Sequence, residues 1–372
     1  MNILLEKQKI SELESEKRLI ILLSRLTFSE EIVNEVSTIL QDKHFNWFEF
    51  YKYALYHKVL TLCWKNILQL CPEVFQPKYA RELIHAAYLA VKERNQLYQN
   101  EINAIVELLD DNNVKVIPVK GAYLIPQIYK DYGVRYSGDA DFLIRYEDLE
   151  KAEKILGEKG YIKGNYNFKE RSIWKISRRE DIKWKTFMSN SHPLIKLSDS
   201  ELFSTYKVDF RFALDDSLRK QPINEILDTY ISSGQVKAAY YLIHLCTHFY
   251  DEAKHSADIE LTKDMNIIKL CDIREYIIQV TTSNDLKELV CFAKKYGLEK
   301  QVYFTMLFLF LIYNDGYEEE ILEGLKIEDD AFIYTYGDNT LTNDQKTNLS
   351  IADRLFACGK MINEIKPAKL FL

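Results

Sequence analysis

The 372-residue sequence contains little glycine and proline, 12 and 7 residues respectively, against 25 tyrosines and 19 phenylalanines. Because glycine and proline interrupt regular elements, this composition favours long elements, mostly helices. Hydrophobic residues make up 47% of the chain and charged residues 28%, which excludes an intrinsically disordered protein. A chain of this length buries a sufficient core without disulfides or metals and suggests about two or three domains.

Paired cysteines and long apolar runs are also lacking. The six cysteines are scattered and form no CxxC pair, which excludes a disulfide framework and a zinc knuckle. The longest apolar stretch, residues 302–313, is shorter than the roughly 20 residues that a membrane-spanning helix needs. Residues 1–18 mix Glu and Lys with apolar side chains and lack the apolar core of a signal peptide. The sequence therefore predicts a cytoplasmic protein with no membrane partner.

A strong charge of one sign is missing as well. The 49 Lys and Arg residues against 56 Asp and Glu residues give a net charge of −7. This balance provides no general attraction for nucleic acid, so a phosphate-binding site must be local. One local positive region, residues 163–185, combines Lys and Arg residues with Trp174 and Trp184. This region is either a surface that binds an anionic acceptor or nucleic acid, or a solvated face without a ligand. The sequence therefore gives no strong signal for nucleic-acid binding.

Hydrophobic periodicity divides the chain into three parts. Apolar residues recur at helical spacing from about Ser11 until the polar cluster 110–113. The pattern then alternates, and it predicts a strand at 114–119, a helix at 122–132 that Pro126 kinks or restarts, a strand at 140–145 and a helix at 146–160. Residues 161–214 read as strands, best at 182–188 and 206–212. Helical spacing returns after Asp215 and continues almost to Leu372, with breaks near 232–234, 281–284, 314–316 and 337–343.

These patterns predict an α+β fold with a small mixed sheet. We expect an N-terminal helical region at residues 1–112, an α/β core at 113–215 and a C-terminal helical region at 216–372.

One group of residues in the α/β core points to chemistry. Lys120 and Gly121 end the first strand, Asp139 and Asp141 begin the next, and Asp209 lies in a later apolar strand. Residues i and i+2 of a strand face the same way, so Asp139 and Asp141 converge if Asp139 already has strand geometry. Carboxylates that lie so close together repel one another unless a cation lies between them. Their oxygens are ligands that suit Mg²⁺. A shared metal site would satisfy all three acids.

A structural interpretation accounts for the same residues. In it Asp139 caps the turn after Gly138, and Asp141 pairs with Arg135 or Arg145. Lys120 is then a solvated lysine at a strand end, and Arg135 is a structural partner of Asp139. From the residues alone both interpretations stand.

The order of the motifs resembles an uncharacterised nucleotidyltransferase family of the DNA polymerase beta-like superfamily. The likeness covers roughly residues 40–280 and rests on a combination of short motifs, each weak alone. It is carried by residues 119–124, Tyr129, Arg135, residues 138–144, Gly160–Tyr161 and residues 208–212, with helical regions at 47–67 and 241–248. Ala122 stands where the wider superfamily usually has serine.

The resemblance implies a nucleotidyltransferase core that moves an NMP group from an NTP to a hydroxyl acceptor, with two Mg²⁺ ions as cofactors. The acceptor is left open between a small molecule, a peptide, a protein and RNA. The resemblance also assigns the metal-binding and catalytic residues, Asp139, Asp141 and Asp209, and the nucleotide-binding residues, Lys120, Gly121, Arg135 and Arg211. The alternative is a catalytically silent nucleotide-binding regulatory or interaction protein, against which the three intact carboxylates argue. Arg211 shares a strand face with Asp209 and either orients that carboxylate or touches substrate.

Three histidines are further candidates for the site. His244 and His248 are one helical turn apart, a spacing that can bind zinc. No third ligand is obvious, so a structural role is favoured for both. His57 is expected to be buried and hydrogen-bonded and not catalytic.

Overall fold

The computed structural model describes residues 3–74, 76–260, 264–337 and 345–357. By its internal contacts the chain separates into two compact units, Tyr88–Tyr241 and Met1–Ala87 together with Leu242–Leu372. The long helix α6 (Lys78–Asp111) and helix α11 (Ala238–Lys254) each contain one of the two boundaries. The predicted ranges 1–112, 113–215 and 216–372 stay a prediction.

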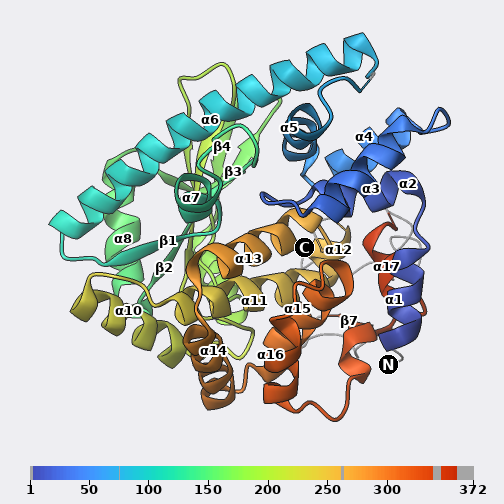
Figure 1. Cartoon of the computed structure of the whole chain (residues 1–372). Helices are drawn as coiled ribbons and strands as arrows, with labels where there is room; N and C mark the ends of the chain where they lie inside the picture. Colours follow the sequence, from blue (N-terminus) through green and yellow to red (C-terminus); the bar gives the residue numbers. More distant parts are fainter. Residues whose placement is uncertain (1–2, 75, 261–263, 338–344, 358–372) are drawn as a thin grey trace. The chain divides into compact units, whose positions relative to one another are not determined.

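Where the structure describes it, the unit with both chain ends is helical apart from two short strands (Figure 1). Its remaining elements are α1 (Ile3–Ser11), α2 (Ser15–Leu23), α3 (Glu30–Gln41), α4 (Trp47–Tyr56), α5 (Leu60–Leu70), α12 (Ser256–Glu260), α13 (Ile267–Val280), α14 (Ser283–Tyr296), α15 (Glu299–Ile312), α16 (Glu318–Leu325), α17 (Ile351–Leu355), the 3₁₀ turn Ala331–Tyr334, β7 (Thr335–Tyr336) and β8 (Gln345–Lys346).

Helix α15 explains the longest apolar run of the sequence. Its side chains are buried around the whole circumference from Phe304 to Ile312, which is typical of a helix inside a protein core. Of the residues described, no helix is both long and apolar enough to cross a membrane.

The helix ends in the C-terminal part follow the local sequence signals. Helix α10 (Gln221–Ser233) ends before Gly234, which has a φ of 74°. Helix α14 begins with a capping box between Thr282 and Asp285 and ends at Gly297, whose φ is 63°. These sites confirm the predicted breaks near 232–234 and 281–284. Most of the break predicted at 337–343, and the helical pattern expected beyond residue 357, lie outside the described residues.

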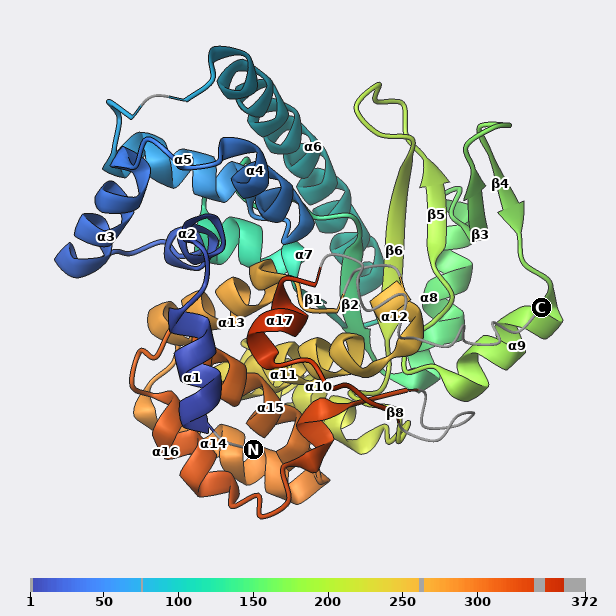
Figure 2. The same ribbon diagram turned by 90° about the vertical axis from the view of Figure 1, so that its right-hand side faces the viewer.

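The second unit is built on a mixed six-stranded sheet, which confirms the predicted α+β class (Figure 2). The strand order is β1-β2-β6-β5-β3-β4. Strands β2 and β6 are parallel, and the other neighbours are antiparallel. The strands are β1 (Val116–Val119), β2 (Ala140–Ile144), β3 (Ile162–Asn167), β4 (Ser172–Lys175), β5 (Leu194–Leu197) and β6 (Thr205–Arg211).

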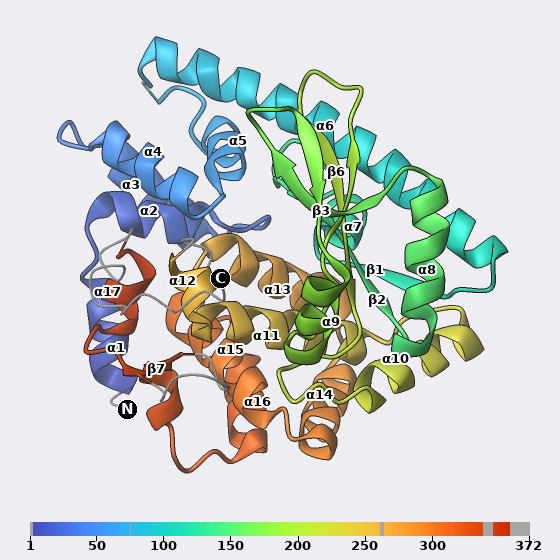
Figure 3. The same cartoon turned by 180° about the vertical axis from the view of Figure 1, so that it is seen from behind.

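Helices α6 and α8 (Tyr146–Glu158) cover one face of this sheet (Figure 3). The core between them contains Phe142 of β2 and Phe210 of β6, packed with Ile105 of α6 and Leu156 of α8. Successive side chains of a strand face opposite ways, so the residues that flank Phe142 and Phe210 lie on the other face. That second face carries the acidic residues.

The predicted helix at 122–132 is shorter and changes its hydrogen bonding. Helix α7 (Gly121–Leu124) starts before Pro126, and a π-helical turn (Ile125–Tyr129) follows it. The Lys130 amide donates to the Ile125 carbonyl at 2.8 Å, five residues back. Pro126 therefore marks a change of helix type and not the start of the helix.

The strand predicted at 182–188 is wrong, because residues 182–187 belong to helix α9 (Arg178–Phe187). Ser177 and Glu180 form a capping box at its N-terminus, with both reciprocal hydrogen bonds. The cap and the residues after it favour a helix over the alternating pattern of Ile182, Trp184 and Thr186. The strand predicted at 206–212 is confirmed as β6.

Candidate active site

Asp141 and Asp209 are direct neighbours on parallel strands. Their Cα positions are paired in the register of β2 and β6, and both strands place large apolar residues on the covered face. Adjacent strands lie about 4.8 Å apart, so the two carboxyl groups start from neighbouring backbone positions on the same face of the sheet. The fold therefore brings these two acids together, although they are far apart in the sequence.

Asp139 does not have the strand geometry on which its convergence was predicted. It lies in a bend before β2, which begins at Ala140. It nevertheless joins the group through Lys207, whose Nζ lies 3.6 Å from Asp139 Oδ2 and 3.2 Å from Asp209 Oδ2. Lys207 is two residues before Asp209 on β6, so both side chains use the same face.

Lys120 occupies a strained turn between β1 and α7. Its backbone has a φ of 51° and a ψ of −129°, a combination that non-glycine residues rarely adopt. Its Nζ lies 2.8 Å from Asp141 Oδ1, and its side chain is only 20% exposed. The interpretation of Lys120 as a solvated lysine is therefore wrong.

The structural partners proposed for Asp141 were also wrong. Its ion-pair partner among the described residues is Lys120, and Arg145 pairs with Asp228.

Burial and mutual repulsion perturb the acids. Burial raises the pKa of Asp141, Lys120 lowers it, and Asp139 and Asp209 raise it again, to about 7. The pKa of Asp209 is also raised, chiefly by burial, although Lys207 acts in the opposite direction. Asp209 Oδ1 is buried and has no hydrogen-bond partner among the described residues. The cluster therefore contains more negative charge and more acceptor atoms than its two lysines satisfy.

Gly121 is required at its position by close contacts. A Cβ atom there would lie 2.1 Å from Ser137 Oγ and 2.8 Å from Arg135 Nη1. Arg135 and Ser137 are both buried. The structure therefore places the Arg135 guanidinium and the Ser137 hydroxyl against the turn that follows Lys120. Although position 122 is alanine, Ser137 brings a hydroxyl close to Gly121.

Arg211 donates hydrogen bonds to backbone carbonyls that follow β6. Its Nε donates to the Ala213 carbonyl at 3.0 Å, and its Nη2 donates to the Leu214 carbonyl at 2.9 Å. These bonds fix the chain after β6, which favours a structural role for this residue.

Helix α6 holds the loop that leads to Asp139. The Asn95 side chain donates to the carbonyls of Tyr132 and Arg135, both at 2.7 Å. Tyr98 Oη donates to the Gly138 carbonyl at 3.2 Å and to the Thr205 carbonyl at 2.9 Å, so it ties the loop to β6. Arg94 adds a hydrogen bond to the Ser137 carbonyl.

Sequence reasoning missed the α6 residues Arg94, Asn95 and Tyr98. It also missed Ser137 and Lys207. Helical spacing marks α6 but does not show which loop it contacts. For Lys207 a signal existed, since it shares a strand face with Asp209 by its i−2 position.

The three histidines proposed as further site residues contact neighbouring protein groups. His57 is buried, burial lowers its pKa to about 3, and its Nδ1 accepts a hydrogen bond from the Ile267 amide at 3.2 Å. This confirms the prediction that His57 is buried and hydrogen-bonded. His248 Nε2 lies 3.4 Å from Glu252 and its ring stacks on buried His244. Across the part of the chain that the structure describes, no three His, Cys, Asp or Glu side chains are grouped closely enough to hold a metal as they stand.

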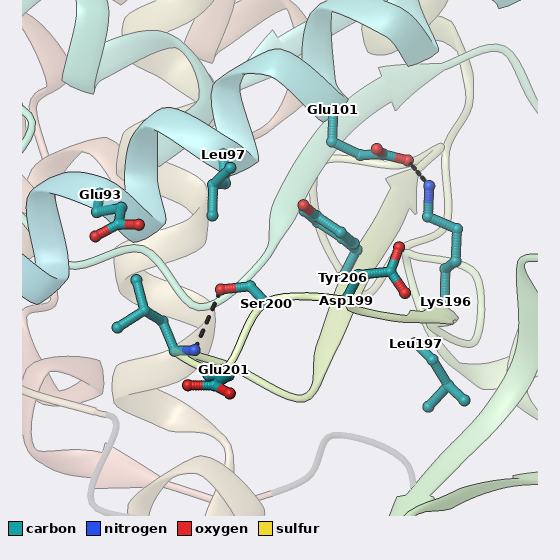
Figure 4. Close-up of a pocket in the computed structure, with 10 residues that line it drawn as sticks. Glu93, Leu97, Glu101, Lys196, Leu197, Asp199, Ser200, Glu201 and Tyr206 are labelled. Carbon is teal, nitrogen blue, oxygen red and sulfur yellow. Dashed lines mark hydrogen bonds and ion pairs between the residues drawn. The ribbon is translucent and has the colours of Figure 1, made fainter.

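A cavity of about 660 Å³ lies on the other side of the sheet, beside α6 (Figure 4). Its lining includes Glu93, Glu101, Lys196 and Tyr206, and an ion pair joins Lys196 to Glu101. Lys196 and Tyr206 are paired in register on the face of β5 and β6 that α6 covers. The cavity is therefore separate from the acidic cluster.

The basic region 163–185 divides into two parts. Lys163 and Lys185 belong to an ion network with Glu153 and Asp181, with N–O distances of 2.5 to 3.4 Å. The other part is exposed and forms no ion pair with any described residue; it consists of Lys169, Arg171, Lys175, Arg178 and Arg179. The first part is ion-paired and mostly buried and therefore not a solvated face, and a ligand for the second part stays a prediction.

The family comparison covers the site as a whole. A family model described as uncharacterised nucleotidyltransferase matches residues 43–314, which include every candidate site residue. No curated protein and no solved structure matches the chain significantly. The matched region contains the helix–sheet unit, the Lys120–Gly121 turn and the three acids. Since the match spans most of the sequence, the chain belongs to the uncharacterised nucleotidyltransferase family.

Proposed function

We propose that this chain is a Mg²⁺-dependent nucleotidyltransferase that moves an NMP group from an NTP to the hydroxyl of an acceptor. The observation that carries the proposal is the register pairing of Asp141 with Asp209, with Asp139 drawn to the same place through Lys207. A family of nucleotidyltransferases supports the reaction class. The three carboxylates support the dependence on a divalent cation.

The chemistry of the three acids, although not their present spacing, suits a hard cation. Asp139, Asp141 and Asp209 supply carboxylate oxygens, and Asp209 Oδ1 is a buried acceptor without a hydrogen-bond partner among the described residues. We propose these three residues as the ligands of two Mg²⁺ ions. When bound, the ions would stabilise negative charge on the phosphoryl oxygens and lower the pKa of the acceptor hydroxyl.

The protein groups then have distinct tasks. The acceptor oxygen forms a bond to the α-phosphorus, the bond to pyrophosphate breaks, and the hydroxyl proton passes to the Asp209 carboxylate. Lys120 and Arg135 neutralise the triphosphate, and Gly121 leaves space for a close approach.

The test measures pyrophosphate release and label transfer from α-labelled NTPs, with and without Mg²⁺, over a panel of small-molecule, peptide, protein and RNA acceptors. We expect Asp141→Asn to lower turnover by about 100-fold or more, because it removes charge that acts on the transition state. Glu101→Gln is the matched control, since it neutralises a lysine-paired carboxylate on the covered face of the same sheet.

Full turnover in Asp141→Asn would show that the metal role is wrongly assigned. Stabilisation by an NTP without pyrophosphate release over the whole panel would instead favour a nucleotide-binding regulatory protein.

A further inference from the structure

Lys207 stands where two of the proposed metal ligands face one another. It contacts Asp139 and Asp209 with one ammonium group, and it reaches them from the strand that carries Asp209. The other lysine of the site, Lys120, contacts Asp141. Lys207 is therefore a charged link between the bend before β2 and strand β6.

The contacts of Lys207 are ion pairs and not short hydrogen bonds. The N–O distances of 3.2 and 3.6 Å are longer than the 2.7–2.9 Å of a strong ammonium–carboxylate hydrogen bond. One carboxylate oxygen of Asp209 keeps no hydrogen-bond partner among the described residues. Lys207 therefore leaves part of the buried Asp209 carboxylate without a hydrogen bond from a described residue.

The side chain of Lys207 can leave without unfolding the sheet. It is 35% exposed, whereas those of Asp209 and Asp141 are 11% exposed. A long flexible side chain with an exposed part reaches solvent by a change of rotamer.

We propose that Lys207 is an internal counter-ion that holds Asp139 and Asp209 together when no divalent cation is bound, and that a divalent cation must displace its ammonium group. The inference rests on the proposed function, because it takes these two aspartates as ligands of that cation. It makes Lys207 a positioning residue that sets the affinity for the metal.

The consequence is a competition between one lysine and one cation. The apparent dissociation constant for the metal is the intrinsic value divided by the fraction of molecules in which the ammonium has left. Removing the charge of Lys207 therefore strengthens metal binding, whereas removal of a merely structural residue would weaken it.

The experiment measures Mg²⁺ and Mn²⁺ binding by isothermal titration calorimetry in the full chain without nucleotide. We expect Lys207→Met to lower the dissociation constant about tenfold, which corresponds to about 1.4 kcal/mol. Lys207→Arg keeps the charge and should bind the metal as weakly as the wild type. Lys196→Met is the matched control, since Lys196 is paired with Glu101 on the opposite face of the sheet, and its metal affinity should not change.

Thermal unfolding gives a second readout. In EDTA, Lys207→Met should be less stable than the wild type, because the acids lose their counter-ion, and Mg²⁺ should raise its melting temperature by more. If Lys207→Met does not fold, Lys207→Gln replaces it, since glutamine keeps a polar end without the charge. Unchanged or weaker metal binding in the folded neutral variant overturns the inference.

Asp139→Asn separates the two proposals. If this variant leaves Mg²⁺ binding unchanged, the proposed ligand set is wrong, and the inference fails with it. If Asp139→Asn weakens binding but the neutral Lys207 variants do not strengthen it, the ligand set stands and only the inference about Lys207 fails.

Discussion

Replacing Gly121 with alanine tests whether the turn after Lys120 is as tightly packed as the structure shows. The added Cβ would lie 2.1 Å from Ser137 Oγ, 2.7 Å from Ser137 Cβ and 2.8 Å from Arg135 Nη1, whereas ordinary contacts begin at 3.4 Å. The loop must retreat by about 1 Å, and we expect a loss of about 1–3 kcal/mol of stability, as for an overpacked core. Because this loop leads to Asp139, turnover should fall by about 100-fold.

Gly157 provides the matched control. It lies in helix α8, and a Cβ there meets nothing within 4 Å. Gly157→Ala should therefore stabilise the protein by about 0.5–1 kcal/mol through the helix propensity of alanine. Urea unfolding followed by circular dichroism compares the two variants, and the two substitutions should shift the midpoint in opposite directions.

A second variant tests the named contact. Ser137→Gly removes both Ser137 atoms that meet the new Cβ, so Gly121→Ala with Ser137→Gly should recover at least half of the lost stability. If Gly121→Ala is as stable and active as Gly157→Ala, or if the two losses simply add, the packing argument for this turn is wrong.

Three further predictions use stability measurements. Asn95→Ala removes two 2.7 Å hydrogen bonds to loop carbonyls and should cost about 1–3 kcal/mol in urea unfolding; a cost near zero would contradict the role of α6. Since the pKa of Asp141 rises from 3.8 to about 7 on folding, the folded form keeps a proton that the unfolded chain loses, and this residue lowers stability as pH rises from about 4 to 7. In EDTA, Asp141→Asn should lack that component of the melting-temperature profile, and an identical profile would refute it. For His57 the pKa falls from 6.5 to about 3, so stability is lost as pH falls below 6.5, and His57→Asn, which keeps an acceptor for the Ile267 amide, should show a shallower acid slope than the wild type.

The sequence predicted the pairing of distant acids better than it predicted local geometry. Asp209 between apolar neighbours indicated a charge in an apolar strand that needs a partner, and the register with Asp141 brings the two acids together. Asp139 was placed on the same strand because an acidic-x-acidic pair fits an alternating pattern, but the chain bends there. The bend depends on hydrogen bonds from α6, which no local pattern reveals.

The error at residues 182–188 had a different cause. Alternating large side chains favoured a strand, whereas the Ser177–Glu180 capping signal just upstream favoured a helix. The local cap was the better guide, because an exposed helix depends on its first turn more than on a buried face. Lys207 was overlooked because its partners depend on strand order, which a single sequence does not specify.

The parallel pairing of β2 with β6 makes the chemistry sensitive to changes in chain length. Asp209 faces Asp141 only because the segment between β5 and β6 delivers the strand in one register. Adding one residue inside β6, just before Asp209, would turn that carboxylate into the apolar layer beneath α6 and bring Phe210 to the face that carries Asp141. Variation in length should therefore be tolerated in the loop 198–204 and excluded within the strand itself.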